Sequence, residues 1–174
     1  MSDSIEDRFS ALTRRLERVE DELAIHRLIV RYGLAVDAGE AEAAMELFTK
    51  DTSYEVRPAG NGADDDANTT LVMQGRAAVG EMVRSESHQK LLPNAAHTIG
   101  PAVVHVDGDT ATATGYTRIY HRENDDVRMF RMAVNHWELV KLEGRWFVHR
   151  RYAQDLGAED AQDLMRRALD HPVD

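Results

Sequence analysis

Two side chains suited to proton transfer lie at boundaries of the predicted secondary structure, one at the end of a helix and one at the start of the strands. Asp37 follows the apolar residues 34–36 at the end of a helical pattern, where a negative charge opposes the helix dipole by about 0.3–1 kcal/mol. His97 lies among small and apolar residues at the start of the strand-like half of the chain. A carboxylate on one ring nitrogen fixes a histidine tautomer and stabilises the imidazolium, so the two would form an acid–base pair. A solvent-facing turn aspartate and a histidine of the core or sheet edge also fit these positions.

Three polar residues of the predicted strands are further candidates. His121 ends a long strand, and its alternative is a surface histidine before a charged turn. Asn135 stands in mid-strand, where asparagine is a poor former and a buried amide needs hydrogen-bond partners, so it either positions a substrate or belongs to a structural polar network. Arg131 shares the face of Asn135 and could bind a carboxylate or phenolate, or pair with one of the protein's own acids. The remaining candidate substrate-binding residues are Tyr54, Tyr120 and Trp137.

The sequence lacks the residues and motifs that several classes of enzyme need. The chain has no cysteine, which excludes disulfides, thiolate nucleophiles and zinc sites built on cysteine. It also lacks a Gly-rich phosphate loop, a Gly-x-Ser-x-Gly elbow and a His-Glu-x-x-His helix. A net charge of −10 disfavours a nucleic-acid partner. We therefore expect a site that works without a metal or a cofactor.

The length of 174 residues and the hydrophobic content of 43% fit one globular domain. We place it at residues 1–155, followed by a helical tail at 156–174. No apolar stretch approaches the roughly 20 residues that span a bilayer, and the charged N-terminus lacks the apolar run of a signal peptide. We expect a cytoplasmic protein with no membrane partner.

The first third of the chain reads as helix. Apolar residues recur at three- and four-residue spacing between Leu16 and Val30, which predicts an amphipathic helix that continues through Tyr32 and ends near Gly39. Further helices are predicted at residues 44–48, 75–92 and 158–169.

Strand-like segments dominate the second half. They cover residues 52–57, 102–106, 110–121, 127–141 and 145–152. The turns at 107–109 and 143–144 are typical of hairpins, so the later strands form an antiparallel meander and the fold class is α+β. Residues 58–70 hold three consecutive aspartates and predict a flexible solvated loop, because the alternating ligands of a calcium loop are missing.

These segments resemble the SnoaL-like family of the nuclear transport factor 2-like superfamily. The resemblance lies in AIHRLIVRYGLAVDAG (24–39), MELFTKD (45–51), HTIG (97–100), VDGDTA (106–111) and GRW (144–146). It covers about residues 10–153. It implies a cone-shaped fold, in which a strongly curved mixed or antiparallel sheet and N-terminal helices close an apolar pocket.

Within that family the functional resemblance is to scytalone dehydratase, bile-acid 7α-dehydratase and hexachlorocyclohexane dehydrochlorinase. These share an aspartate at the end of the first helix and a histidine at the first long strand, which Asp37 and His97 match. Tyr32 is similar to a tyrosine of the bile-acid enzyme, His121 falls at or next to a second polar catalytic position, and Asn135 resembles an asparagine of scytalone dehydratase. Val36 and the loop at 58–70 depart from the pattern, so the substrate does not transfer.

The resemblance implies a lyase that performs acid–base β-elimination, above all dehydration, on a hydrophobic cyclic or aromatic molecule. Isomerisation, polyketide cyclisation and carbon–carbon cleavage would use the same proton transfer. A non-catalytic ligand-binding or dimerising module would instead leave Asp37 and His97 beyond hydrogen-bonding distance and fill the pocket with side chains. We expect a homodimer or homotrimer, since the outer sheet face would carry Phe130, Met132 and Val134.

Overall fold

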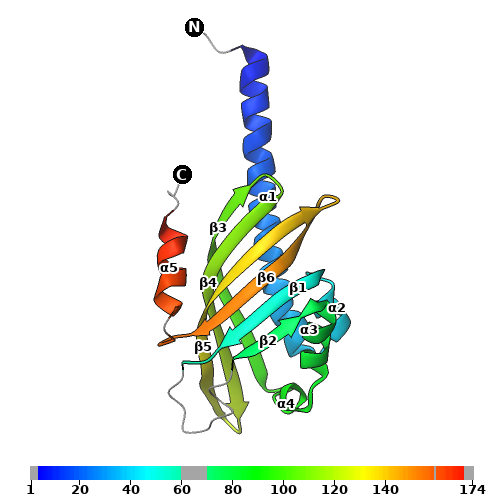
Figure 1. The fold of residues 1–174 in the computed structure, drawn as a ribbon, viewed down its shortest axis with the longest axis vertical. Coiled ribbons are helices and arrows are strands. Elements are labelled where there is room, and N and C mark those ends of the chain that lie inside the picture. The colour runs from blue at the N-terminus through cyan, green and yellow to red at the C-terminus, as the bar shows by residue number, and fades with distance from the viewer. Residues whose placement is uncertain (1–3, 60–69, 159, 171–174) are drawn as a thin grey trace.

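A six-stranded sheet with the order β2-β1-β6-β5-β4-β3 forms the body of the computed structural model, which describes residues 4–59, 70–158 and 160–170 (Figure 1). The strands are β1 (Phe48–Arg57), β2 (Leu71–Gln74), β3 (Ala95–Asp107), β4 (Thr110–Glu123), β5 (Asp126–Leu142) and β6 (Arg145–Asp155). The β1–β6 pair is parallel and all other pairs are antiparallel. The sheet is therefore mixed, curved and open, and the predicted α+β class is confirmed.

Helices cover both faces of this sheet. They are α1 (Ile5–Asp37), α2 (Ala41–Met45), α3 (Gly75–Arg84), α4 (Glu86–Gln89) and α5 (Ala161–Leu169). The C-terminal part of α1, together with α2, α3 and α4, lies on the concave face, and α5 lies on the convex face (Figure 1). None of the described helices is both long and apolar enough to cross a membrane.

The ends of α1 are defined by local chemistry. Ser4 and Asp7 form a reciprocal capping box at its start. The helix ends at Asp37, as predicted, and Gly39 adopts a φ of +71° in the turn that follows, a conformation that glycine adopts without strain. Only the part of α1 from Ile25 onward is buried, and its side chains pack against β3, β6 and α2.

The structure differs from the predicted elements in four places. The helix expected over 75–92 is divided at Ser85, whose hydroxyl accepts a hydrogen bond from the His88 amide and starts α4. The second helix ends before Phe48, which begins β1 instead. β2 was not predicted, and β3 begins at Ala95 rather than at residue 102. Most of the predicted loop at 58–70 lies outside the described residues.

Irregularities in the ladders change which face a side chain occupies. The register shifts between Ile119 and Tyr120 in the β4–β5 pair, and between Glu138 and Leu139 in the β5–β6 pair. Such bulges bend a strand and increase its twist.

Val134 lies on the convex face as expected, but it is only 2% exposed because Leu164 and Ala161 of α5 cover it, while Phe130 stays 64% exposed. The predicted outer patch is thus partly occupied by the protein's own last helix.

Candidate active site

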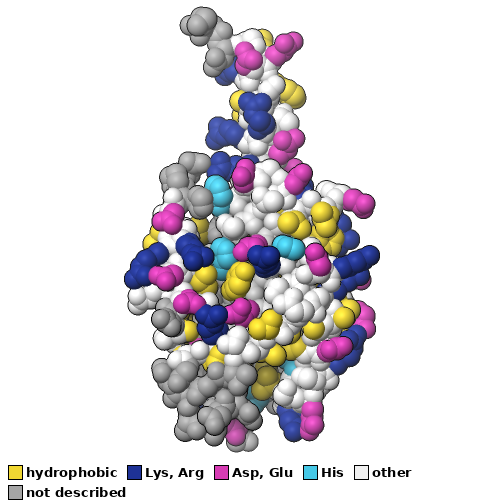
Figure 2. Space-filling model, in the orientation of Figure 1, with side chains coloured by type: hydrophobic (Ala, Val, Ile, Leu, Met, Phe, Trp, Pro, Cys, Tyr) yellow, Lys and Arg dark blue, Asp and Glu magenta, His cyan; other side chains and the backbone are white. Residues whose placement is uncertain are grey.

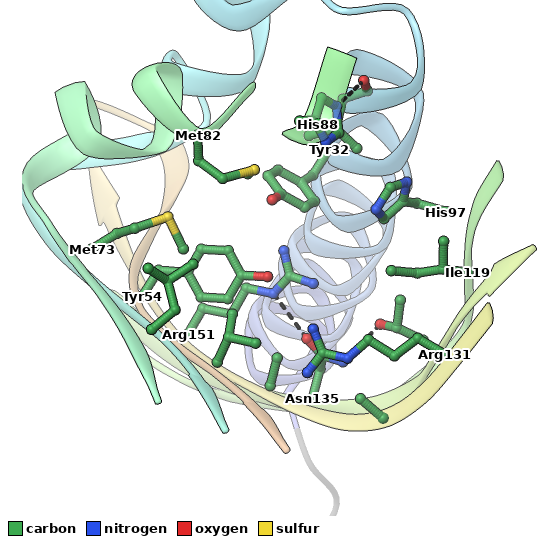
Figure 3. Close-up of a pocket in the computed structure, with 16 residues that line it drawn as sticks. Tyr32, Tyr54, Met73, Met82, His88, His97, Ile119, Arg131, Asn135 and Arg151 are labelled. Atoms are coloured by element: carbon green, nitrogen blue, oxygen red, sulfur yellow. Dashed lines mark hydrogen bonds between the residues drawn. The ribbon is translucent and has the colours of Figure 1, made fainter. Parts of the chain in front are cut away.

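A cavity of about 140 Å3 lies between the concave face of the sheet and the helices α1, α3 and α4. Its apolar lining comes from Val36, Val56, Leu71, Met73, Met82, Ile119, Ala133 and Ala153. Its polar lining comes from Tyr32, Tyr54, His88, His97, Thr117, Arg131, Asn135 and Arg151. Figure 3 shows that these polar groups converge on one space from the helix side and from the sheet side. A mostly apolar pocket with a few convergent polar groups is the usual form of a small-molecule site.

Asp37 and His97 are joined by two hydrogen bonds. His97 Nδ1 lies 2.6 Å from Asp37 Oδ1, and the His97 backbone N–H donates to Asp37 Oδ2 at 2.7 Å. Both carboxylate oxygens are thus engaged by one residue, which fixes the plane of the imidazole and leaves Nε2 as its second nitrogen. A non-catalytic module was expected to hold Asp37 and His97 beyond hydrogen-bonding distance, and the structure contradicts that expectation.

Two features of the surrounding elements hold this pair together. Gly33 faces the backbone of β3 so closely that a Cβ there would lie 2.6 Å from the His97 carbonyl oxygen, and this close approach of α1 to β3 brings Asp37 to His97. The buried His88 hydrogen-bonds through Nε2 to the carbonyl oxygen of Val36 at 2.9 Å. That carbonyl belongs to the last turn of α1 and also accepts a hydrogen bond from the Gly39 N–H at 3.1 Å. His88 therefore anchors the residue next to Asp37.

Tyr32 supplies a neutral hydroxyl to the same cavity. Its ring packs edge-on against Phe48 and Tyr54, with centroid distances of 5.5 and 6.4 Å. Burial, and to a smaller degree the neighbouring Tyr54, raise the pKa of Tyr32 far above its ordinary value, although Arg151 opposes this. The phenol consequently stays protonated and can donate a hydrogen bond.

Arg151 is a buried cation without a carboxylate partner among the described residues. Its side chain is held by an Nε hydrogen bond of 2.9 Å to Asn135 Oδ1, and its guanidinium lies 4.4 Å from the ring centroids of both Tyr32 and Tyr54. The residue is 3% exposed, and its Nη1 has no hydrogen-bond partner. A buried charge in such a position costs several kcal/mol unless an opposite charge meets it, so a ligand with negative charge would be stabilised here.

Asn135 and Arg131 complete the polar floor. Asn135 is fully buried, and its amide nitrogen donates a hydrogen bond to Thr117 Oγ1 at 2.7 Å. Its amide oxygen accepts the hydrogen bond from Arg151 Nε, so Asn135 positions the arginine. Arg131 pairs through Nε with Asp155, one of the protein's own acids, but its Nη2 is buried without a partner. Figure 3 shows both guanidinium groups directed into the cavity.

Three predicted site residues are not among those that line the cavity. Trp137 lies under the site, with its ring centroid 5.6 Å from the Arg151 guanidinium. Tyr120 pairs with Met129 beyond the β4–β5 bulge, one residue away from the cavity-facing Ile119, so strand alternation places it on the opposite face. His121 pairs with Ala95 near the end of β4. Their roles stay predictions.

Besides Thr117 and the apolar lining, three residues that shape the site were not predicted. Arg151 follows a bulge in β6, where Leu139 pairs with Val148 but Glu138 pairs with Arg150. Simple alternation from Trp146 and Val148 would therefore point Arg150 inward in its place. Gly33 and His88 act through tertiary contacts, for which the sequence carries no local signal.

The comparison with protein families decides the affiliation of the chain. Residues 17–152 match the model of the SnoaL-like domain. The chain belongs to the SnoaL-like family. No curated protein matches its sequence.

Solved structures agree with this SnoaL-like assignment. An NTF2-like protein with a cystatin-like fold from Novosphingobium aromaticivorans is 31% identical, with a TM-score of 0.79 over 95% of this chain and 99% of that one. A candidate scytalone dehydratase from the same organism is 20% identical, with a TM-score of 0.61 over 79% of this chain and 85% of that one. The β-subunit of a candidate aromatic-ring-hydroxylating dioxygenase, also from that organism, is 22% identical, with a TM-score of 0.64 over 80% and 91%. At 20–22% identity, the last two show the fold of this SnoaL-like chain and nothing more.

Proposed function

We propose that this SnoaL-like protein is a lyase that removes water from a hydrophobic cyclic molecule by acid–base β-elimination. The observation that carries the proposal is the Asp37–His97 pair, doubly hydrogen-bonded at the wall of a cavity that also holds Tyr32 and Arg151. A histidine oriented by a carboxylate is suited to take a proton and pass it on. The Asp37 and His97 motifs, which resemble those of dehydratases of this family, support the same class of reaction.

The elimination can be written with the residues of the cavity. His97 Nε2 takes the proton from the carbon next to a carbonyl group, while Asp37 stabilises the imidazolium. Negative charge then develops on the carbonyl oxygen, where the unpartnered Nη1 of Arg151 and the hydroxyl of Tyr32 can stabilise it. The bond between the next carbon and its hydroxyl breaks as the double bond forms. The hydroxyl leaves as water after taking the proton from His97, which returns to its neutral form.

The size of the cavity limits the substrate. A volume of about 140 Å3 is close to that of an apolar cavity of about 150 Å3 that binds benzene in another protein. We therefore propose a reacting group of one ring with a β-hydroxyketone arrangement, or a larger molecule of which only this ring enters the cavity.

The test uses 3-hydroxycyclohexanone as a minimal probe, followed by mass spectrometry and by the ultraviolet absorbance of the enone. We expect the product to have lost one water, and His97→Ala and Asp37→Asn to reduce turnover by about 10²–10⁴-fold. His136→Ala, on the convex face of the same sheet, is the matched control and should act within a few-fold of the wild type.

Other outcomes distinguish the alternatives. Deuterium taken up from heavy water next to the carbonyl, with no loss of water, would show that the base removes a proton but that the hydroxyl does not leave, which favours the isomerase alternative. Turnover that survives both substitutions within a few-fold would rule out the Asp37–His97 pair as the catalytic base.

A further inference from the structure

The N-terminal half of α1 extends far beyond the rest of the molecule (Figure 1). Every residue from Ser4 to Glu20 is exposed, and the first buried side chain of the helix is Ile25. At a rise of 1.5 Å per residue, the segment from Ile5 to Leu23 is about 27 Å long. Helices of this length are marginal in water on their own and are usually stabilised by packing of an apolar face.

Such an apolar face is present on the projecting segment. Six large apolar side chains, each 47–85% exposed, follow one another at alternating spacings of four and three residues: Ile5, Phe9, Leu12, Leu16, Val19 and Leu23. The same spacing continues through His26 to Val30, which is 50% exposed. We call this row the α1 stripe. An average spacing of 3.5 residues over more than three heptads is the pattern of a coiled-coil seam, whereas a helix packed on a globular core needs a wider apolar face.

The charges beside the α1 stripe are complementary to a second copy of the same helix. In a parallel pair, Arg15 would face the partner's Glu20, and Glu22 would face the partner's Arg27. In an antiparallel pair that sets Ile5 against Val30, Arg15 would face the partner's Glu22, and Glu6 would face the partner's Arg27. Unlike charges at these flanking positions favour the pairing of helices, and Figure 2 shows both signs of charge along the projecting segment. Both orientations thus match a copy of the chain with itself.

We propose that the α1 stripe is a coiled-coil seam that joins copies of this chain. The seam lies away from the cavity, so the assembly would hold the active sites apart on a common stalk. This inference is independent of the proposed reaction. It also differs from an assembly through the outer sheet face, because α5 already covers Val134 there.

Molar mass in solution, measured by light scattering during size-exclusion chromatography, tests the proposal on the full chain. We expect the wild type to elute with a multiple of the monomer mass, and Leu12→Glu/Leu16→Glu to elute as a monomer. Ser10→Glu/Ala11→Glu adds the same two charges away from the stripe and should keep the wild-type mass. A monomeric wild type at high concentration, or an unchanged mass for the stripe variant, would overturn the proposal.

Cross-linking gives a second and independent readout, because the natural chain has no cysteine. Under mild oxidation, a parallel seam predicts that Leu12→Cys alone gives a disulfide-linked dimer. An antiparallel seam predicts that the dimer requires Leu12→Cys together with Leu23→Cys. Ala11→Cys is the control at a neighbouring position away from the stripe. If neither the single nor the double variant cross-links above the level of this control, copies of α1 do not pair along the stripe.

Discussion

The two faces of the sheet use neighbouring residues of the same strands for opposite purposes. On the concave face, Asn135 and Arg151 line a small, mostly apolar cavity. One residue further along each strand, His136 and Tyr152 face a larger polar depression beside α5, with a volume of about 360 Å3.

The charges of the two faces differ as well. The convex depression is lined by the carboxylates of Glu55, Glu138, Asp160 and Asp163 and by two arginines, so its cations have acidic partners at hand. The concave cavity is lined by two arginines, of which Arg131 is paired with Asp155 and Arg151 has no carboxylate partner in the described part of the chain. The convex depression thus has more carboxylates than arginines, whereas the concave cavity keeps one arginine that a negatively charged group could pair with, as the proposed reaction requires.

Replacing the unpaired arginine should have the largest effect on this contrast. We expect Arg151→Met to reduce turnover of 3-hydroxycyclohexanone by about 10²–10³-fold, the usual cost of removing one donor to a developing oxyanion. Its free energy of unfolding should change by less than about 1 kcal/mol, because relief of a buried charge offsets the lost hydrogen bond to Asn135. Enzyme kinetics and urea denaturation measure the two quantities.

The adjacent residue provides the control for this experiment. Arg150 is half-exposed on the same strand and faces Glu138. Arg150→Met should leave turnover within a few-fold and the free energy of unfolding within about 0.5 kcal/mol. A loss of several kcal/mol on Arg151→Met would mean that the buried arginine stabilises the fold and is not held for a ligand.

A smaller effect is expected where helix and strand approach each other. Gly33→Ala places a methyl group against the carbonyl oxygen of His97, so α1 and β3 must separate. We expect a loss of about 1–3 kcal/mol in the free energy of unfolding and a fall in turnover of about ten- to a hundred-fold, since His97 moves relative to the substrate. Gly100→Ala lies on the same strand, and its methyl group would meet nothing closer than 3.5 Å. Equal effects of the two substitutions would contradict a special role for the approach at Gly33.

The smallest effect concerns the convex face. Burial lowers the pKa of His136, whose Nδ1 lies 2.8 Å from Thr114 Oγ1. The unfolded chain therefore binds a proton more readily at this residue than the folded protein does. Stability from the neutral histidine is fully present above the unfolded pKa of about 6.5 and is lost as the pH falls below it, at no more than about 1.4 kcal/mol per pH unit. We expect His136→Gln to flatten the decline in urea-denaturation free energy between neutral and mildly acidic pH, and an unchanged decline would assign it to other groups.

The sequence predicts the regular parts of this fold well. The end of α1 at Asp37 and four of the strands follow from periodicity and turn residues, which act locally. The start of β3 is obscured because Pro93, Gly100 and Pro101 interrupt the alternation, and a register shift lies between Ile99 and Ala102. β2 is too short to show a period of its own.

Prediction of the candidate site depends on what each residue needs from the fold. Asp37 and His97 are recognisable because their motifs resemble those of a family, and the structure brings them together. Arg151 was not predicted as a site residue because the bulge in β6 reverses the alternation just before it. Tyr120 lies on the opposite face by simple alternation, because it directly follows the cavity-lining Ile119 in a regular part of β4. A single extra residue in a ladder, which leaves no mark in composition, thus decides which side chains reach the cavity.

The unpartnered Nη1 of Arg151 has a consequence for the resting protein. Without a ligand the cavity is short of one negative charge, so small anions from the surroundings would compete with the proposed substrate for it. Chloride, formate or acetate in a buffer would act as weak inhibitors and, by binding only the folded state, as weak stabilisers. The anion of the buffer salt should therefore affect both the measured activity and the measured stability of this protein.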